Sequence, residues 1–145
     1  MKDEKNEVDV LDELNKGACM GRDAIHFILD KVSDSDLRDE LDVQYNKYKE
    51  ITDEISELYP EYSNKEPHET NSMNKAMTWF GIEMNTMLDK STSKIAELLL
   101  QGTNMGIIEG RKLLNNNNTD EEVNKLIQKY VDMQEDAVEN LKKFL

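Results

Sequence analysis

The chain has 145 residues, a formal net charge of −13 at pH 7 and charged side chains at 34% of its positions. Binding to nucleic-acid phosphates needs a basic patch, and attachment to anionic lipid is disfavoured by acidic surfaces, so we expect neither nucleic-acid nor membrane partners. The opening segment MKDEKNEVDV lacks the apolar stretch of a signal peptide, and no apolar run approaches the roughly 18 residues of a membrane span. We therefore expect a soluble, cytoplasmic protein with one domain over residues 1–145.

The composition favours an all-α fold. The chain has only two prolines and six glycines, and its β-branched residues do not alternate with polar ones as they do in strands. The single cysteine, Cys19, excludes an intramolecular disulfide and an all-cysteine metal site.

Apolar or small residues recur every three to four positions along five segments, which is the spacing of helices that pack in a bundle. A short helix with methionine at four of these positions is expected over residues 71–88. Four long helices are expected at residues 8–32, 35–59, 92–114 and 120–144.

Cap-forming residues mark the boundaries between these segments. The sequence SDSD predicts a turn and a new helix, with Ser33 or Ser35 as its N-cap. Pro60 ends the second helix, because proline cannot continue the helical hydrogen-bond pattern. The sequence TDEE before the last helix reads as a capping box between Thr119 and Glu122.

The lengths of the connections predict the topology. Tight links join the first long helix to the second and the third long helix to the fourth, so each pair is expected to form an antiparallel hairpin. About thirty residues lie between the hairpins, enough to run the length of the bundle. Two hairpins joined by one long crossover, here with a short helix inside it, is the ferritin-like arrangement.

A central polar layer is predicted where the four long helices lie side by side. Gln44 and Gln134 fall at the two places where ferritin-like di-iron proteins carry Glu-x-x-His, and Gly21 and Gly102 fall near the single-Glu places. Amides and glycines do not supply the anionic and imidazole ligands that iron needs, so we predict no metal and no other cofactor. The glutamines then have two interpretations: ordinary polar core residues, or remnants of a metal layer. Glu109 is expected on the inward side of its helix, paired with a cation.

The two histidines offer little support for a metal or catalytic site. His26 is close to Asp23 on the first helix, where a boundary histidine explains it as well as a ligand does. His68 lies in the connection between the hairpins. Neither histidine forms a recognisable nucleophilic arrangement with Cys19, so we predict no catalytic residues.

Glycines recur four residues apart on two predicted helices, and therefore share one face of each. The first helix carries Gly17 and Gly21, and the fourth segment carries Gly102 and Gly106. We interpret these faces as close helix–helix contacts, because small residues let two backbones approach. A small cavity or ligand slot beside the glycines, or a helix irregularity, is the alternative.

The short helix is expected to form an interface. Its apolar side is wide for so short an element, and Trp79 and Phe80 point about 100° apart around the helix. We predict a homodimer or a protein partner docked over residues 73–88, with the alternative that this helix only covers its own bundle. The predicted interface residues are Met77, Trp79, Phe80 and Met84.

Three stretches together resemble a bacterial ferritin-like family known as a domain of unknown function: DVLDELNKGACMGRDAIHFILDKVSDSDLRDEL, MTWFGIEMNTML and IAELLLQGTNMGIIEGRKLL. The resemblance covers nearly the whole chain and implies a ferritin-like four-helix bundle of the kind discussed alongside bacterial stress or spore proteins. The sequence departs from ferritins at the ligand positions.

Three functions remain open at this point. The favoured one is a non-catalytic interaction protein with an eroded di-metal layer, in a homo-oligomer. A di-iron or other metal-dependent oxidoreductase or metal store is the second, and a small-ligand carrier with a buried cavity near Gly102 is the third.

Overall fold

The computed structural model describes residues 4–67 and 71–145, with side chains at 5–67, 78 and 80–145. The described residues form helices without strands, which confirms the all-α prediction. The largest difference from the predicted bounds is the start of the first helix, at Glu4 instead of residue 8. The elements are α1 (Glu4–Leu29), α2 (Ser35–Leu58), the 3₁₀ turn η1 (Tyr59–Glu61), α3 (Asn71–Thr86), α4 (Thr92–Asn116) and α5 (Glu121–Lys142).

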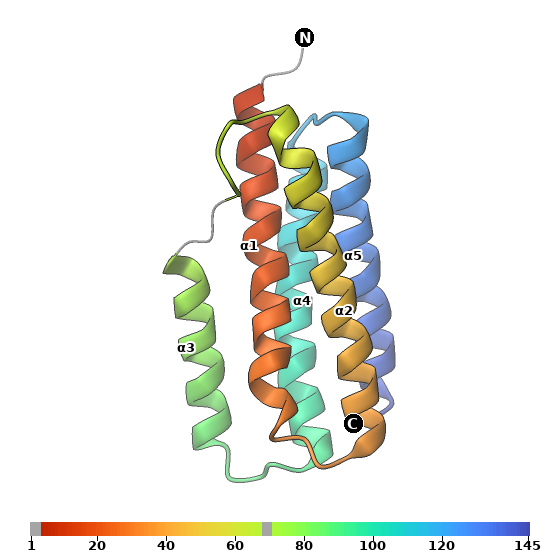
Figure 1. Ribbon diagram of the computed structural model, residues 1–145. Coiled ribbons are helices and arrows are strands. Elements are labelled where there is room, and N and C mark those ends of the chain that lie inside the picture. The colour runs from red at the N-terminus through yellow and green to blue at the C-terminus, as the bar shows by residue number, and fades with distance from the viewer. Residues whose placement is uncertain (1–3, 68–70) are drawn as a thin grey trace.

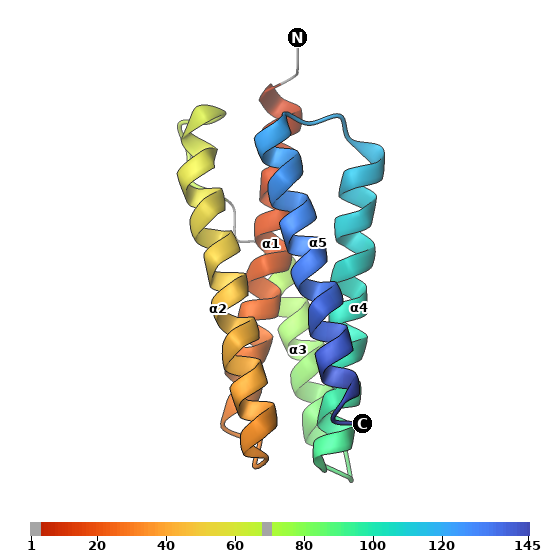
Figure 2. The same ribbon diagram turned by 90° about the vertical axis from the view of Figure 1, so that its right-hand side faces the viewer.

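The four long helices pack side by side as two antiparallel hairpins, α1–α2 and α4–α5 (Figure 1). The connection between the hairpins runs from the end of α2 back to the opposite end of the bundle, where α4 begins. This connection contains α3, which packs on the outside of α1 (Figures 1 and 2). Within the described part of the chain, none of these helices combines the length and apolar character that a membrane crossing requires.

Asp34 caps the start of α2, so the prediction of Ser33 or Ser35 was wrong. The Leu37 backbone N–H donates to Asp34 Oδ1 at 2.9 Å. Asp34 stands directly before the first helical residue with an extended backbone, and this places its carboxylate under the exposed N–H groups of the first turn. Ser35 is already inside the helix.

The start of α5 is capped from another helix, and the predicted Thr119–Glu122 capping box is not formed. Asp120 is the N-cap residue, without a side-chain cap hydrogen bond. Its backbone N–H instead donates to Glu7 Oε2 of α1 at 3.1 Å, and the Glu7 side chain is only 1% exposed. A carboxylate at this place also complements the positive end of the α5 dipole.

The core of the bundle consists of the apolar stripes of the long helices, as their spacing predicted. Burial of each large apolar side chain stabilises the fold by on the order of 1.5–3 kcal/mol. This contribution dominates the stability of an amphipathic bundle. The completely buried members include Leu11, Leu14 and Ile28 of α1, Leu37, Leu41, Ile51 and Ile55 of α2, and Ile127 and Leu141 of α5.

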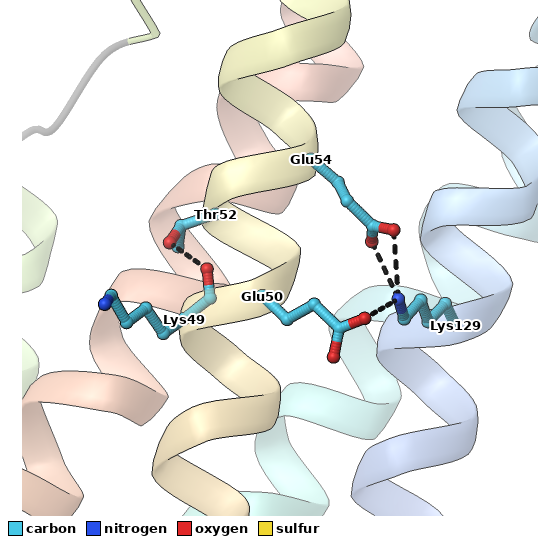
Figure 3. A network of polar contacts seen from close by, with 5 residues as sticks. All are labelled: Lys49, Glu50, Thr52, Glu54 and Lys129. Atoms are coloured by element: carbon cyan, nitrogen blue, oxygen red, sulfur yellow. Dashed lines mark hydrogen bonds and ion pairs between the residues drawn. The ribbon is translucent and has the colours of Figure 1, made fainter.

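An ion-pair cluster joins α2 to α5 at the surface (Figure 3). Lys129 Nζ donates to Glu50 Oε1 at 2.8 Å and to the carboxylate of Glu54 at 2.9 and 3.0 Å. The hydrogen bonds to Glu50 and Glu54 raise the pKa of Lys129. Because all three side chains are partly exposed, we expect the pairs to contribute at most about 1 kcal/mol and to weaken with salt.

Candidate functional site: a cavity beside the glycine faces

A cavity of about 320 Å³ lies between α1 and α4 and reaches into the middle of the bundle. The glycine faces of α1 and α4 form its two sides, Tyr48 of α2 and Tyr130 of α5 line it further, and Phe80 of α3 contributes one more wall. Most of its lining is apolar. Ligand pockets in proteins have volumes of about 300–1,000 Å³ and predominantly apolar walls, so this cavity has the dimensions of a small-molecule site.

The α1 glycines make room for tyrosine rings. A β-carbon at Gly21 would lie 2.6 and 2.8 Å from ring carbons of Tyr48, and one at Gly17 would collide with the Tyr130 hydroxyl. Separations below 3.0 Å are essentially never found for real β-carbons. Glycine at both positions leaves the space through which the two phenol rings enter the centre of the bundle.

The α4 glycines differ from one another. A β-carbon at Gly106 would collide with Gln134 Oε1, and one at Gly110 would lie 2.6 Å from a methyl carbon of Val131. A β-carbon at Gly102 would meet nothing within 4 Å. Gly102 therefore faces the open space of the cavity.

The expected close packing of two helix backbones at Gly17, Gly21, Gly102 and Gly106 was thus wrong. Side chains, not backbones, occupy the space over three of these glycines, and the fourth borders the cavity. The cavity named as an alternative is what the structure contains. The physical reason is that tyrosine and glutamine on α2 and α5 fill part of the volume that glycine leaves and keep the helices apart.

Both predicted glutamines are buried and line the cavity, but their hydrogen-bond partners differ. Gln134 Oε1 accepts from the Tyr48 hydroxyl at 3.4 Å across the bundle, and its Nε2 donates to the Tyr130 carbonyl oxygen at 3.2 Å. Gln44 Nε2 donates along its own helix to Glu40 Oε2 at 2.7 Å. The buried polar groups of the cavity wall are therefore neutral: amides, phenols and the Thr103 hydroxyl.

The two phenols stay protonated over the physiological range. Burial, followed by the proximity of Tyr130, raises the pKa of Tyr48 far above its ordinary value. Burial is also the main cause that raises the pKa of Tyr130, and the negative charge of Glu109 adds to it. The ring centroids of Tyr48 and Tyr130 lie 6.4 Å apart, and the Tyr48 hydroxyl donates to Gln134, so these neutral polar side chains lie close together.

Glu109 does not belong to a central layer, contrary to the prediction. Its side chain is 72% exposed and lies 3.7 Å from Lys112 Nζ, at the mouth of the cavity. The Lys16 ammonium on the α1 side of the mouth contacts Glu13 at 2.8 Å. Each charge at the mouth is thus balanced by a neighbour on its own helix.

The predicted interface on the short helix is partly buried in the molecule itself. Phe80 and Met84 are 5% and 1% exposed, and the Phe80 ring packs edge-on against Phe27 of α1 with centroids 6.0 Å apart. These two residues therefore attach α3 to its own bundle and were wrongly assigned to an intermolecular contact. The side chains of Met77 and Trp79 lie outside the described residues.

Within the described part of the chain, His26 is not brought together with other metal-ligating side chains. His26 is exposed beside Tyr45, with ring centroids 6.3 Å apart, and the Asp23 carboxylate accepts from Arg22 Nε at 3.0 Å. His68 lies outside the described residues. Among the residues whose positions are described, no group of three or more His, Cys, Asp or Glu side chains is arranged to hold a metal ion.

The sequence analysis missed the two tyrosines that shape the site. Both fall on the apolar stripes of their helices, and that spacing alone predicts only a core position. The signal that would have found them is a match of residue sizes between neighbouring helices. Tyr48 and Tyr130 are the largest residues at stripe positions that lie level with glycines on the neighbouring helix.

Comparisons with protein-family models, with curated proteins and with solved structures found no match to this chain.

Proposed function

We propose that this protein is a non-catalytic carrier or sensor that binds a small, mainly apolar molecule in the cavity between α1 and α4. The observation that supports the proposal most directly is Gly102. A glycine in the middle of a helix costs about 1 kcal/mol relative to alanine, and here no neighbouring atom requires it. A residue that lowers stability without a packing reason is understandable if it keeps a binding site open.

The size of the cavity supports the same proposal. In enclosed apolar cores, each Å³ of unfilled space costs about 24 cal/mol, so an empty cavity of this size costs on the order of several kcal/mol, less here because one side opens to solvent. A bound molecule would recover much of this free energy. An engineered apolar cavity of about 150 Å³ accommodates benzene, so roughly twice that volume suits about ten to twelve non-hydrogen atoms.

The test is the identification and exchange of the bound molecule. Protein purified under native conditions is extracted with solvent, and the extract is examined by mass spectrometry for a stoichiometric small molecule. The stripped protein is then titrated with 1-decanol in thermal denaturation. At ten times the Kd, binding stabilises by about 1.4 kcal/mol, which raises the Tm by about 3–6 °C.

Two leucine variants of α4 make the test specific. Gly102→Leu places four carbon atoms in space that 1-decanol would occupy and should abolish the Tm increase. Asn104→Leu adds the same side chain two residues further on, at an exposed position, and should leave the increase intact. Equal responses of the two variants would refute binding in the cavity.

We also propose that the bundle is ferritin-like and that Gln44 and Gln134 are remnants of a metal layer. Two antiparallel hairpins joined by a long connection support the first statement, and two buried amides lining one cavity support the second. Metal analysis of protein purified without chelator tests the idea, because stoichiometric iron or manganese would instead favour the metal-dependent alternative.

We also propose self-association, but through a different surface of α3 from the one that the sequence predicted. Phe80 and Met84 are buried in the molecule, whereas Ile82 on the same helix is 55% exposed and Leu88 just after the helix is fully exposed. A homodimer would therefore use the Ile82 side of α3. Light scattering after size-exclusion chromatography should show a dimer that Ile82→Glu dissociates, and a monomeric wild type would refute the proposal.

A further inference from the structure

The polar groups of the cavity wall indicate what kind of small molecule it would hold. At its inner part lie the Tyr48 hydroxyl, the Gln134 amide and the Tyr130 ring, all neutral and all on side chains that are at least 97% buried. The Tyr48–Gln134 hydrogen bond is long, at 3.4 Å, so both groups retain capacity for a stronger partner. The remainder of the wall is mostly apolar toward Met20, Gly102 and Met105, and carries charged side chains only at the mouth.

Charged head groups fit this wall poorly. A charge that leaves water without an opposite charge to pair with has a large desolvation penalty, and the buried polar groups of the wall are all neutral: amides, phenols and the Thr103 hydroxyl. At the mouth, Lys16 contacts Glu13 and Glu109 contacts Lys112, so neither sign of charge meets an uncompensated partner there. The net charge of −13 opposes an anion further.

We propose that the cavity binds an uncharged amphiphile of about ten to twelve non-hydrogen atoms, with a single hydroxyl or carbonyl group that hydrogen-bonds to Tyr48 and Gln134 and an apolar body that lies along the open face of Gly102. The inference rests on the proposed function and specifies its ligand. A hydroxyl suits the site because it both donates and accepts, and so matches an amide oxygen and a phenol at once. The volume limits the length of the body.

The experiment compares three probes that share one chain and differ only in the head group: 1-decanol, decanoate and decylammonium. Dissociation constants are measured by isothermal titration calorimetry on the full chain at neutral pH, for wild type, Gly102→Leu and Asn104→Leu. We expect 1-decanol to bind at least tenfold more tightly than either ion, and binding to be lost in Gly102→Leu only. Tyr48→Phe, which keeps the ring over Gly21, should weaken 1-decanol about fivefold with little effect on the weak binding of the ions.

Each outcome has a separate meaning. If decanoate or decylammonium binds as tightly as 1-decanol and depends on Gly102, the uncharged ligand class is wrong while the proposed function stands. If 1-decanol binds best but Tyr48→Phe and Gln134→Met both leave its affinity unchanged, the placement of the hydroxyl is wrong. If no probe binds in a way that Gly102→Leu abolishes, the proposed function itself fails. Circular dichroism melts of each variant establish that the fold is retained.

Discussion

The phenol ring of Tyr48 on α2 lies directly over Gly21 on α1 and occupies the space that a β-carbon at position 21 would need. Gly102 on α4 borders the same cavity, but nothing lies within 4 Å of the place of its β-carbon. The two glycines thus serve opposite purposes. One admits a side chain into the core, and the other leaves volume unfilled.

Alanine substitution should therefore have opposite effects at these positions. Gly102→Ala should stabilise by about 1 kcal/mol, because alanine has the higher helix propensity and fits without contact. Gly21→Ala should destabilise by about 1–3 kcal/mol, because the buried ring of Tyr48 has to shift. Urea denaturation with comparison of midpoints measures both. Gly81→Ala, whose β-carbon would make an ordinary 3.8 Å contact with Phe27, is the matched control and should behave like Gly102→Ala.

The buried hydrogen bond between Tyr48 and Gln134 should reveal itself in a double-mutant cycle. Gln134→Leu alone leaves the Tyr48 hydroxyl without its acceptor and should cost about 1–3 kcal/mol. Adding Tyr48→Phe removes the unsatisfied hydroxyl and should recover part of the loss. The cycle is measured by urea denaturation, and strictly additive effects would contradict coupling between the two side chains.

High pH should unfold the protein through its tyrosines. Burial together with a hydrogen bond to Asp12 raises the pKa of Tyr59 to about 12, and burial raises the pKa values of Tyr48 and Tyr130 as well. A folded-state pKa above the unfolded value of about 10 gives stability that is complete below pH 10 and is lost as the pH rises through the folded value. The raised pKa of Lys129 acts in the same direction.

We therefore expect stability to be independent of these groups up to about pH 10 and to fall steadily above it. Absorbance at 295 nm, which follows phenol ionisation, should rise together with the loss of helical circular dichroism. Tyr48→Phe removes one of these phenols. Relative to its own stability at pH 7, this variant should therefore lose less stability at alkaline pH than the wild type does. Full ionisation of all tyrosines in a protein that keeps its helical signal would contradict the prediction.

The sequence predicted the helices well because burial on one face makes apolar residues recur every three to four positions. On α2, Leu37 and Leu41 are four residues apart, as are Ile51 and Ile55. In the second half of α4 it placed Glu109 on the inward side, whereas the structure buries Thr103 and Gly110. Glycines carry little hydrophobic signal, so the stripe through Met105 and Glu109 looked as plausible as the buried one through Thr103 and Gly110. Met105 is in fact 57% exposed.

The site depended on tertiary relationships that spacing does not contain. A glycine face indicates that something comes close, but a backbone, a tyrosine ring and an empty volume all fit the same pattern. The apolar stripe of α3 was equally ambiguous, because Phe80 would be apolar whether it covered its own bundle or a partner. Only the position of α3 beside α1 separates these alternatives for Phe80 and Met84.

The contact between Glu7 and the start of α5 leads to the last prediction. Glu7 Oε2 accepts from the Asp120 backbone N–H at 3.1 Å, so α1 supplies the acceptor for the N–H of the α5 N-cap residue, whose own carboxylate accepts from the Tyr62 hydroxyl at 2.8 Å. Glu7→Ala should cost about 1–3 kcal/mol, because it removes this acceptor and creates a gap at a buried position. Glu7→Gln keeps an acceptor oxygen and should cost less than about 1 kcal/mol, chiefly through the lost interaction with the helix dipole.

Glu121→Gln, at an exposed first-turn position of α5, controls for the general effect of removing an acidic charge and should change stability by less than about 0.5 kcal/mol. Hydrogen exchange at residues 119–124 should accelerate in Glu7→Ala but not in Glu121→Gln, and wild-type stability of Glu7→Ala would show that α5 needs no cap from α1.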